Sequence, residues 1–317
     1  MLNAVILVGG EGTRLRPLTE RMPKPMLPLL GRPLIDYTFD HLRSAGVGKA
    51  ILACGYLPTQ IQAHFGENAE GLELEYRVEP EPLGTGGGIR FGADGLDRTF
   101  LALNGDSLRE ADLARLIEFH RDRGAAATIL LTPVDDPSRF GLVRVDDQGR
   151  VTGFLEKPKP EEIDTNLINA GLYVLEPEVL DLVPEGKQVS IERDVFPILA
   201  DRGRLCALAL PGYWLDVGTP ASYLQAHLDL LERSAGNNIG PAVEGGDIEL
   251  VPPVMAETEV VIEDGARVGP LVYLGAGSRV GSGAVVERVA LLPGAVIPSG
   301  ARIAGAIVSP EFGVIAA

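Results

Sequence analysis

The chain has 317 residues, 45% of them hydrophobic, and a formal net charge of −16 at pH 7. This length suits one large domain plus a smaller one, and the acidic balance argues against a general nucleic-acid or anionic-membrane surface. The longest apolar run is far short of a membrane span, and no basic segment leads into an apolar core at the N-terminus, so we expect neither a membrane helix nor a signal peptide. Cys54 and Cys206 lie in apolar runs, which favours reduced core cysteines in a cytoplasmic protein.

Up to about residue 232, short β-rich runs alternate with amphipathic helical stretches. The pattern predicts strands at residues 4–8, 50–54, 73–77, 99–103 and 128–131, and helices at residues 34–44 and 113–123. Such alternation predicts an α/β fold, with a Rossmann-like, mostly parallel sheet and helices on both faces. Ligands bind at the carboxyl ends of the strands in such sheets, so we expect the site there.

A different pattern begins at residue 262. Aliphatic residues recur every six positions, and glycine follows directly at Gly269, Gly275 and Gly281; the aliphatic positions are Ile262, Val268, Leu274, Val280, Val286 and Leu292, and after a slip of one residue Ile297 and Ile303. A hexapeptide repeat predicts a short left-handed parallel β-helix, whose open end favours homo-oligomers. We therefore divide the chain into a first domain at residues 1–233, a Gly- and Asn-rich linker at 234–250 and a repeat domain at 251–317.

The most informative loop follows the apolar run at residues 4–8. It contains three glycines and three cations; in order its residues are Val8, Gly9, Gly10, Gly12, Thr13, Arg14 and Arg16, with Lys24 in Pro23-Lys24-Pro25. Glycines let backbone N–H groups approach an anion, and the cations add fixed positive charge. We therefore favour a polyphosphate-binding loop over the alternative, an ordinary βα turn. The loop is not a Walker A loop, because no Gly-Lys-Ser or Gly-Lys-Thr follows. It also fits a dinucleotide-binding fingerprint badly, because Leu15 stands where that pattern has its third glycine.

This loop, from Gly9 to Pro17 with Pro23-Lys24-Pro25, resembles the nucleotidyltransferases that join a sugar 1-phosphate to a nucleoside triphosphate, and most closely the mannose-1-phosphate guanylyltransferase group. The resemblance implies that the loop wraps the triphosphate, with Arg14 and Lys24 on its phosphates. It also implies that the two substrates are a nucleoside triphosphate and a sugar 1-phosphate.

Two aspartates are candidates for metal binding. Asp106 follows an apolar run and the turn residues Asn104-Gly105, and Asp216 precedes a predicted helix N-cap at Thr219. Taken alone, each fits a turn or a strand end. The resemblance implies that both aspartates hold Mg²⁺ and that Asp106 is catalytic together with Arg14 and Lys24.

The sugar phosphate is expected on another set of residues. Glu156-Lys157-Pro158 follows the strand-like residues 151–155, where a surface turn is the alternative, and Asn169-Ala170-Gly171 heads a further strand. The resemblance implies that Glu156 and Asn169 hold sugar hydroxyls and that Lys157 binds the sugar phosphate. Gly141 completes the predicted sugar-phosphate site.

A second glycine segment, residues 83–88, opens a predicted helix, so the backbone N–H groups of Gly84 and Thr85 could face the nucleotide. Just before it, Glu79 ends a strand, where relatives that use thymidine or uridine nucleotides carry a glutamine. An ionised carboxylate only accepts hydrogen bonds, and guanine presents two adjacent donors. Glu79 therefore predicts a guanine nucleotide, with a solvated strand-end glutamate as the alternative.

The four histidines exclude one function. Hexapeptide-repeat acyltransferases depend on a histidine base, and none of the histidines, His41, His64, His120 and His227, lies in the repeats. We therefore expect the repeat domain not to be catalytic. The resulting hypothesis is a sugar-nucleotide pyrophosphorylase that uses GTP and mannose 1-phosphate; the alternatives are the same chemistry with dTTP or UTP and glucose 1-phosphate, or with a heptose phosphate, and a non-catalytic regulatory homologue.

Overall fold

The computed structural model describes residues 2–55, 58–156, 159–234, 238–239 and 247–317. Residue contacts divide the chain into two compact units. The sheet unit comprises Met1–Glu11 and Ile35–Trp214, and the coil unit comprises Gly12–Leu34 and Leu215–Ala317. The domain boundaries predicted at residues 233 and 251 stay predictions, and much of the predicted linker, residues 235–237 and 240–246, lies outside the described residues.

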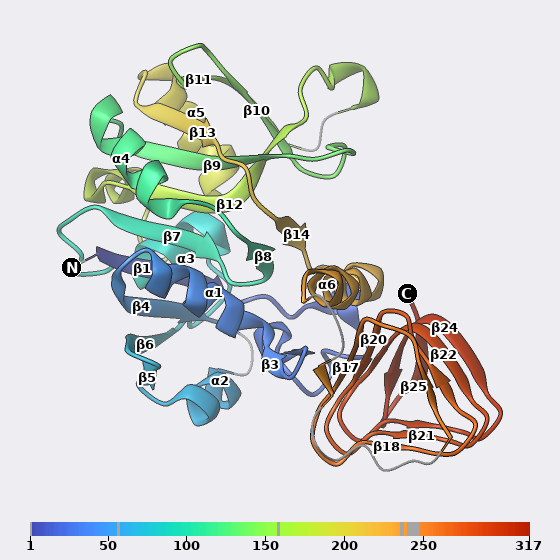
Figure 1. Ribbon diagram of the computed structural model, residues 1–317. Coiled ribbons are helices and arrows are strands. Elements are labelled where there is room, and N and C mark those ends of the chain that lie inside the picture. Colours follow the sequence, from blue (N-terminus) through green and yellow to red (C-terminus); the bar gives the residue numbers. More distant parts are fainter. Residues whose placement is uncertain (1, 56–57, 157–158, 235–237, 240–246) are drawn as a thin grey trace. The chain divides into compact units, whose positions relative to one another are not determined.

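The sheet unit is built on a ten-stranded mixed sheet (Figure 1). Its main path runs β11 (Val151–Glu156), β10 (Gly141–Val145), β12 (Leu167–Leu175), β7 (Phe100–Asn104), β1 (Leu2–Val8), β4 (Val47–Cys54), β6 (Leu72–Val78) and β5 (Asn68–Ala69), while β9 (Ala127–Pro133) pairs with β12 and with β13 (Leu205–Ala209). Strands β7, β1, β4 and β6 are parallel neighbours, and β12 runs antiparallel to both β7 and β9. The predicted α/β class is confirmed.

Helices cover both faces of this sheet. The helices of the described chain are α1 (Leu34–Ser44), α2 (Pro58–Phe65), α3 (Gly84–Gly92), α4 (Leu113–Arg123), α5 (Phe196–Asp201) and α6 (Pro220–Arg233). Ile129 of β9 shares a core cluster with Ile89 of α3 and Phe196 of α5. Thr128 faces the other side, because side chains alternate along a strand, and its Oγ1 lies 2.8 Å from Nδ1 of His120 in α4.

The four parallel strands bring several predicted residues to one edge of the sheet. Strand β1 lies between β4 and β7. The chain first adds β4 and β6 on one side of β1 and then returns to add β7 on the other side, so the strand order reverses at β1. The segments that follow β1, β4, β6 and β7 start with Gly9, Gly55, Glu79 and Gly105. This carboxyl edge at the reversal of strand order is where α/β sheets bind ligands.

The coil unit contains the predicted β-helix, built from short parallel strands β16 to β24 between Glu249 and Ser309, with β25 (Gly313–Ala316) antiparallel to β24. Strand partners such as Val254 and Val272 are 18 residues apart, which is three hexapeptides per coil. The next pair, Val272 and Val289, is 17 residues apart. This shorter coil accounts for the one-residue slip in the repeat. The slip falls before Leu291 and not after Leu292 as predicted, because Leu291 is the register partner of Leu274 and lies in the core cluster, whereas Leu292 does not. The other aliphatic positions from Ile262 to Ile297 fill the interior as predicted.

The coil unit also holds α6, η1 (Thr13–Leu15), η2 (Lys24–Met26), β2 (Pro28–Leu29) and β3 (Arg32–Pro33). Helix α6 packs against coil strands, and its His227 ring lies 5.0 Å from the Tyr273 ring and 4.9 Å from the Tyr223 ring. The Tyr223 hydroxyl donates a hydrogen bond to the Pro28 carbonyl. The segment at residues 12–34 is thereby joined through α6 to the coils. No helix in the described parts of the chain is long and apolar enough to cross a membrane.

Candidate active site

The first glycine loop begins in the sheet unit, directly after β1. Val8 is buried, and Gly9 and Gly10 are exposed. A Cβ added to Gly55, after β4, would lie 2.6 Å from the Gly9 carbonyl oxygen, so the two neighbouring loops touch backbone to backbone. Gly55 was not among the predicted residues, because an isolated glycine after a strand is an ordinary turn signal.

The loop continues in the coil unit, where Gly12 has a left-handed conformation with φ +62 that favours glycine. Its carbonyl accepts hydrogen bonds from the Leu15 N–H (2.9 Å) and the Thr19 hydroxyl (2.8 Å). Thr13 and Arg14 follow in the 3₁₀ turn η1, which starts at this bend. Gly12 therefore sets the direction in which Thr13 and Arg14 leave the loop.

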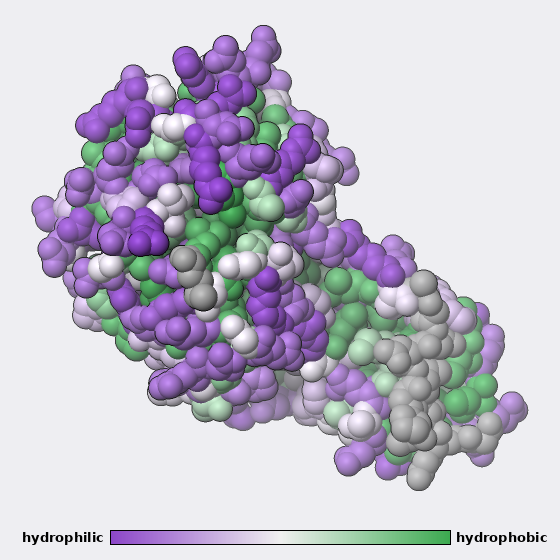
Figure 2. Space-filling view, turned by 60° about the vertical axis from the view of Figure 1, so that its left-hand side comes forward, coloured by the Kyte–Doolittle hydropathy of each residue, from purple (hydrophilic) through white to green (hydrophobic). Residues whose placement is uncertain are grey.

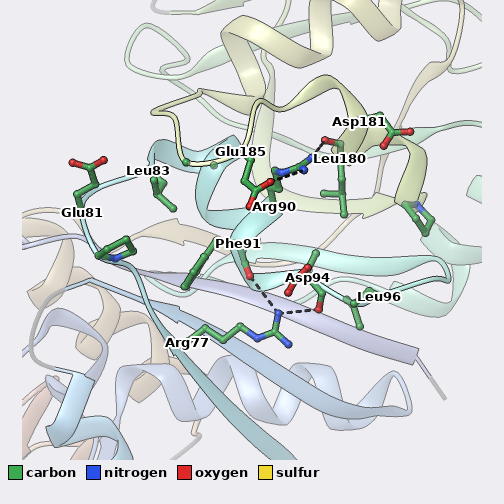
Figure 3. Close-up of a pocket in the computed structure, with 16 residues that line it drawn as sticks. Arg77, Glu81, Leu83, Arg90, Phe91, Asp94, Leu96, Leu180, Asp181 and Glu185 are labelled. Atoms are coloured by element: carbon green, nitrogen blue, oxygen red, sulfur yellow. Dashed lines mark hydrogen bonds and ion pairs between the residues drawn. The ribbon is translucent and has the colours of Figure 1, made fainter.

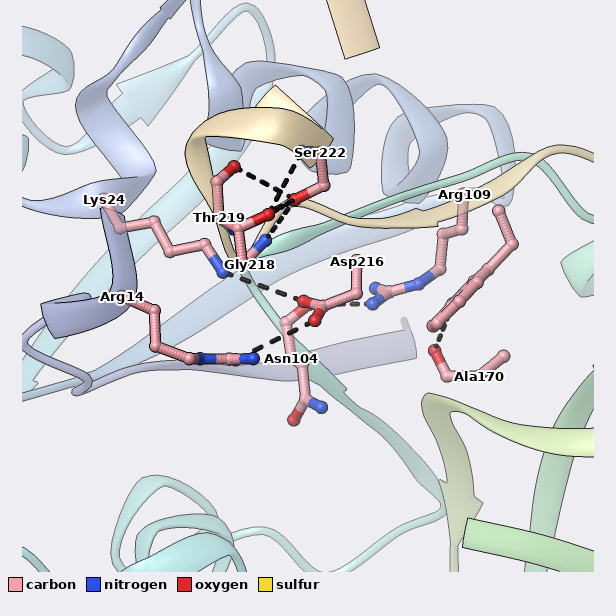
Figure 4. Close-up of polar contacts among 10 residues, drawn as sticks. Arg14, Lys24, Asn104, Arg109, Ala170, Asp216, Gly218, Thr219 and Ser222 are labelled. Atoms are coloured by element: carbon pink, nitrogen blue, oxygen red, sulfur yellow. Dashed lines mark hydrogen bonds and ion pairs between the residues drawn. The ribbon is translucent and has the colours of Figure 1, made fainter. Parts of the chain in front are cut away.

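Three predicted residues of the coil unit lie together, Arg14, Lys24 and Asp216 (Figure 4). Nη2 of Arg14 is 3.9 Å from Oδ2 of Asp216, and Nζ of Lys24 is 3.8 Å from Oδ1. The Lys24 side chain is only 7% exposed, whereas that of Arg14 is 70% exposed. A buried ammonium requires nearby negative charge, so this cluster offers two cations and one carboxylate to a ligand.

Asp216 is placed by the start of α6. Thr219 is the N-cap, and it forms a reciprocal capping pair with Ser222, as Thr219 and Pro220 predict. The N–H of Gly218 also donates to Oγ of Ser222 at 2.9 Å. This capping fixes the turn that follows Asp216.

Asp106 lies in the sheet unit on the loop after β7. The Gly105 N–H donates to the Leu7 carbonyl (3.0 Å), and a Cβ at Gly105 would be 2.8 Å from side-chain atoms of both Ile6 and Val8. Gly105 thus holds the half-buried Asp106 beside the end of β1. Because Asp106 and Asp216 belong to different units, their convergence on one metal ion stays a prediction.

Arg109 is a buried cation near Asp106 that the sequence analysis missed. It is 6% exposed, and its Nη2 donates to the Asn104 carbonyl at 3.0 Å (Figure 4). Burial lowers the pKa of Arg109 to about 10, and the negative charge of Asp106 opposes this shift. No local pattern marked this arginine, because its burial follows from the packing of the strand after the loop.

Glu79 is anchored at the carboxyl edge of β6. Its N–H donates to the Cys54 carbonyl (2.8 Å), and its Oε2 accepts the Leu83 N–H (3.1 Å). Its Oε1 would lie 2.7 Å from a Cβ at Gly88 and 3.8 Å from a Cβ at Gly9. Burial raises the pKa of Glu79, and the hydrogen bond from Leu83 opposes that shift. The carboxylate is therefore held between the two glycine segments instead of extending into solvent.

The second glycine segment opens α3 as predicted, but residues 189–192 pack over it. The N–H groups of Gly86 (2.8 Å) and Gly87 (3.3 Å) donate to the Val189 carbonyl, and Val189 N–H donates back to Leu83. A Cβ at Gly84 would lie 2.6 Å from this carbonyl oxygen, and one at Gly86 would lie 3.0 Å from Cγ1 of Val189. Glycine at position 86 therefore serves close packing.

Asn169 is on β12 next to the Asp106 loop. Its Oδ1 accepts the Gly171 N–H (2.9 Å), and a Cβ at Gly171 would lie 2.6 Å from Nδ2 of Asn104. Gly141 and Glu156 are register partners across β10 and β11. These predicted sugar-phosphate residues thus occupy adjoining strands of one sheet. Lys157 lies outside the described residues.

An aromatic pair that the sequence analysis missed adjoins the Asn169 segment. The Trp214 ring packs edge-on against Phe140, with ring centroids 5.1 Å apart. Nε1 of Trp214 donates to the Ala170 carbonyl at 3.1 Å. Phe140 directly precedes Gly141, so the two aromatic rings border the predicted sugar-phosphate residues.

Carboxylates such as those of Asp106 and Asp216 would hold Mg²⁺ together with substrate phosphates. Among the described residues, no three His, Cys, Asp or Glu side chains form a group that could hold a metal. Mg²⁺ is commonly held by one or two carboxylates together with substrate phosphates. Carboxylates at positions 106 and 216 are suitable hard oxygen ligands for that arrangement.

A separate cavity of about 690 Å³ lies alongside α3, lined from Leu83 at the start of the helix to Leu96 beyond its end (Figure 3). Its two cations are engaged with the protein, since Arg77 donates to the carbonyls of Phe91 and Asp94, and Arg90 donates to that of Leu180. None of the predicted site residues lines it. We therefore do not assign substrate binding to this cavity.

The chain has relatives among known proteins. A family model described as nucleotidyl transferase matches residues 3–233. The chain belongs to the nucleotidyl transferase family. Within this family, a mannose-1-phosphate guanylyltransferase of Mycobacterium tuberculosis is 42% identical over 312 residues, which cover 97% of this chain and 83% of that protein. A UTP–glucose-1-phosphate uridylyltransferase of Synechocystis is 32% identical, covering 98% of this chain and 88% of that protein.

Solved structures of the family agree with the fold. HddC from Yersinia pseudotuberculosis complexed with GMP-PN matches with a TM-score of 0.60 at 30% identity, covering 71% of this chain and 98% of that chain. A UDP-glucose pyrophosphorylase from Acinetobacter baumanii has a TM-score of 0.67 at 24% identity, covering 74% of this chain and 95% of that chain, and shows the common fold alone. The predicted family and its enzyme class are confirmed.

Proposed function

We propose that the protein transfers a guanylyl group from GTP to mannose 1-phosphate, giving GDP-mannose and pyrophosphate. The observation that carries the choice of base is the anchored carboxylate of Glu79. Its Oε2 is held by the Leu83 N–H, and its Oε1 lies between two glycine segments. A carboxylate in this position suits the adjacent N1–H and N2–H₂ donors of guanine, while the carbonyl oxygens of thymine and uracil would be repelled. The 42% identical relative is named for the same reaction.

The proposed reaction is an in-line displacement. A phosphate oxygen of the sugar 1-phosphate attacks the α-phosphorus of GTP, the new P–O bond forms, and the bond to the β-phosphate oxygen breaks to release pyrophosphate. The nucleophile is already ionised at neutral pH, so no strong general base is needed. Catalysis then consists of positioning and charge neutralisation.

Each charged residue has a role in this scheme. Arg14 and Lys24 bind the triphosphate, and Lys157 binds the sugar phosphate, while Asn169 and Glu156 contact sugar hydroxyls. Asp106 and Asp216 hold Mg²⁺, which when bound supplies further neutralisation of the phosphate charge. The closeness of Arg14 and Lys24 to Asp216, at 3.9 and 3.8 Å, supports a common site for phosphate and metal.

Self-association through the repeats is part of the proposal. Val296 and Val314 are 56% and 57% exposed on terminal strands of the coil region. Figure 2 shows apolar side chains on the visible face of the repeat region. Exposed valines on the last strands of the solenoid suit contact with a second copy of the chain.

One assay tests the function. Pyrophosphate release is measured with GTP, dTTP, UTP and ATP against mannose, glucose and heptose 1-phosphates. The highest kcat/KM is expected for GTP with mannose 1-phosphate. Higher efficiency for UTP or dTTP with glucose 1-phosphate would contradict the proposed substrates but still support nucleotidyl transfer to a sugar 1-phosphate. No turnover with any pair would favour the regulatory homologue, against which the presence of all five charged residues, Arg14, Lys24, Asp106, Lys157 and Asp216, already argues.

A further inference from the structure

The carboxylate of Glu192 accepts hydrogen bonds from three hydroxyl groups. No sequence pattern predicted a role for this residue. The hydroxyls of Thr85 and Ser190 donate to its Oε2 at 2.7 and 2.8 Å, and that of Tyr173 donates to its Oε1 at 3.1 Å. Ser190 caps the following helical turn, so the local sequence predicts only a helix start. The structure gives Glu192 a different set of partners, from α3 and β12.

The chain of hydrogen bonds continues to a predicted substrate residue. Nδ2 of Asn169 donates to the Tyr173 hydroxyl at 3.0 Å. Because Oδ1 of Asn169 accepts the Gly171 N–H, both ends of this amide are oriented by the protein. An amide has two N–H donors and two acceptor sites, so Asn169 can still offer one donor and one acceptor to a sugar hydroxyl.

At the other end, the chain reaches the second glycine segment. The Thr85 hydroxyl donates to Glu192 and accepts the Ile191 N–H at 2.9 Å. Both hydrogen bonds tie the first turn of α3 to the segment that carries Glu192. Thr85 is thus held by its side chain, which leaves its backbone as the part that can meet a nucleotide.

Tyr173, in the middle of this chain of hydrogen bonds, is held rigidly. Tyr173 is fully buried, and its ring packs edge-on against Phe196 with centroids 5.1 Å apart. Burial and the charge of Glu192 raise the pKa of Tyr173 well above its usual value, so its hydroxyl stays protonated and donates. A buried hydroxyl with one donor and one acceptor contact transmits orientation from one partner to the other.

We propose that Glu192, acting through Tyr173, is a positioning residue that couples sugar-phosphate binding at Asn169 to nucleotide binding at the Thr85 segment. This inference rests on the proposed function, because it uses the substrate roles of Asn169 and Thr85. A nucleotide that binds at the first turn of α3 displaces Thr85, and the continuous hydrogen bonds carry this displacement through Glu192 and Tyr173 to the Asn169 amide. The sugar phosphate then meets an amide that is already in its binding position, which produces positive cooperativity.

The test measures this coupling directly in the full-length protein. Trp214 is the only tryptophan and donates to the carbonyl of Ala170, next to Asn169, so its fluorescence reports on the sugar-phosphate site. The Kd of mannose 1-phosphate is measured with and without a saturating GTP analogue that carries a methylene bridge between the α- and β-phosphates. If the substrate grid selects another pair, that pair and its methylene analogue are used.

In the unmutated protein the analogue is expected to lower the Kd by on the order of tenfold, within the usual range of coupling. Tyr173→Phe and Glu192→Leu are expected to bring the ratio of the Kd without the analogue to the Kd with it close to one. Glu192→Gln, which keeps an oxygen acceptor, should retain most of it. The control is Thr128→Val, which removes a buried hydroxyl contact to His120 elsewhere in the sheet unit and should keep the full ratio.

Each outcome bears on the proposal. A ratio of one in the unmutated protein, an unchanged ratio in Tyr173→Phe, or an equal loss in Thr128→Val would overturn the coupling while leaving the proposed function intact. Absence of turnover with every substrate pair would overturn the proposed function, and this inference with it. Loss in Tyr173→Phe and Glu192→Leu, with retention in Glu192→Gln and Thr128→Val, supports it.

Discussion

Gly218 provides the space into which the guanidinium of Arg14 extends. A Cβ at position 218 would lie 3.0 Å from Nη2 of Arg14 and 2.8 Å from Oδ2 of Asp216. The contacts are with the ends of side chains, so an added methyl group would displace the two charges without breaking the backbone. The helix cap would remain, because Gly218 contributes to it through its N–H.

Gly218→Ala should therefore reduce activity much more than stability. We expect kcat/KM for the nucleoside triphosphate to fall about tenfold, as one misplaced charge contact of roughly 1.4 kcal/mol implies, with little change in Tm. Gly153→Ala is the matched control, since a Cβ there meets no atom closer than 3.5 Å. Equal kinetics in the two variants would contradict the role of this space.

Asp106→Asn and Asp216→Asn test the metal hypothesis. Each removes one negative ligand from the proposed Mg²⁺ site, so turnover should fall by about 10²–10³-fold, the usual cost of losing a group that stabilises transition-state charge, while circular dichroism stays unchanged. Magnesium titrations should show weaker binding in both variants. Asp164→Asn, which alters an exposed ion pair with Arg144, is the control. Near-normal turnover in Asp216→Asn would remove that residue from the site.

The base preference depends on Glu79. GTP should be preferred to dTTP and UTP by about tenfold or more, because one good bidentate contact contributes about 1–3 kcal/mol. ITP, which lacks the 2-amino group, should be used less efficiently than GTP. Glu79→Gln should lower the efficiency with GTP, and so reduce the preference for GTP over dTTP and UTP as well as the preference for GTP over ITP. Burial raises the pKa of Glu79, so the preference for GTP over ITP should also decline as the pH falls through this raised pKa. Equal efficiency with GTP and dTTP in the unmutated protein would exclude the guanine assignment.

His227 should make stability depend on pH. Burial lowers its pKa to about 3, against an unperturbed 6.5, with a smaller opposing effect of the Pro28 carbonyl. Between these two values the unfolded chain binds the proton and the folded chain does not. Stability should therefore be at its full value above pH 6.5 and decline as the pH falls, by up to about 1.4 kcal/mol per pH unit.

The measurement is the urea midpoint of the full chain at pH 7.5, 6.0 and 5.0. His227→Phe keeps a ring between Tyr223 and Tyr273 but cannot be protonated, so its decline with pH should be shallower. His41 and His120 also have lowered pKa values from burial, and they add to the slope in both proteins. His64→Gln, at an exposed position, should follow the unmutated protein. Parallel curves for His227→Phe and the unmutated protein would contradict the prediction.

Charge at the solenoid end should weaken self-association. Val296→Asp and Val314→Asp place a carboxylate on exposed apolar positions, and the mass measured by light scattering should fall toward that of a single chain. Ile198→Asp, on α5 of the sheet unit, is the control because this residue is likewise exposed, at 38%. An unchanged mass in both valine variants would show that the repeats do not carry the association.

The sequence predicted the elements well where periodicity is local. Helices α1 and α4 have the predicted bounds, and Thr219 and Pro220 correctly marked the start of α6. Strand β4 starts three residues earlier than predicted, because Gly48 and Lys49 interrupt the apolar pattern. Lys49 is accommodated by Glu73 and Glu75 on the neighbouring strand β6, at 3.0 and 2.8 Å, and such cross-strand partners are not visible in a local window.

The candidate site was predicted only in part for the same reason. Glycine loops and strand-end carboxylates carry local signals, which is why Gly12, Glu79 and Asp106 were found. Thr85 and Glu192 are 107 residues apart and meet only through folding, and Glu192 looks like part of a helix cap. The burial of Arg109 and the approach of Gly55 to Gly9 also depend on tertiary packing.

The division into units has a consequence for engineering chimeric enzymes. The chain passes from one unit to the other at residues 11–12, 34–35 and 214–215, so Arg14 and Lys24 are grouped with the coils and not with the sheet from which their loop starts. Exchanging residues 215–317 alone with those of a relative would separate Pro28 from the Tyr223 that hydrogen-bonds to it. A functional hybrid should carry residues 12–34 and 215–317 from the same parent, although 180 residues lie between them in the sequence.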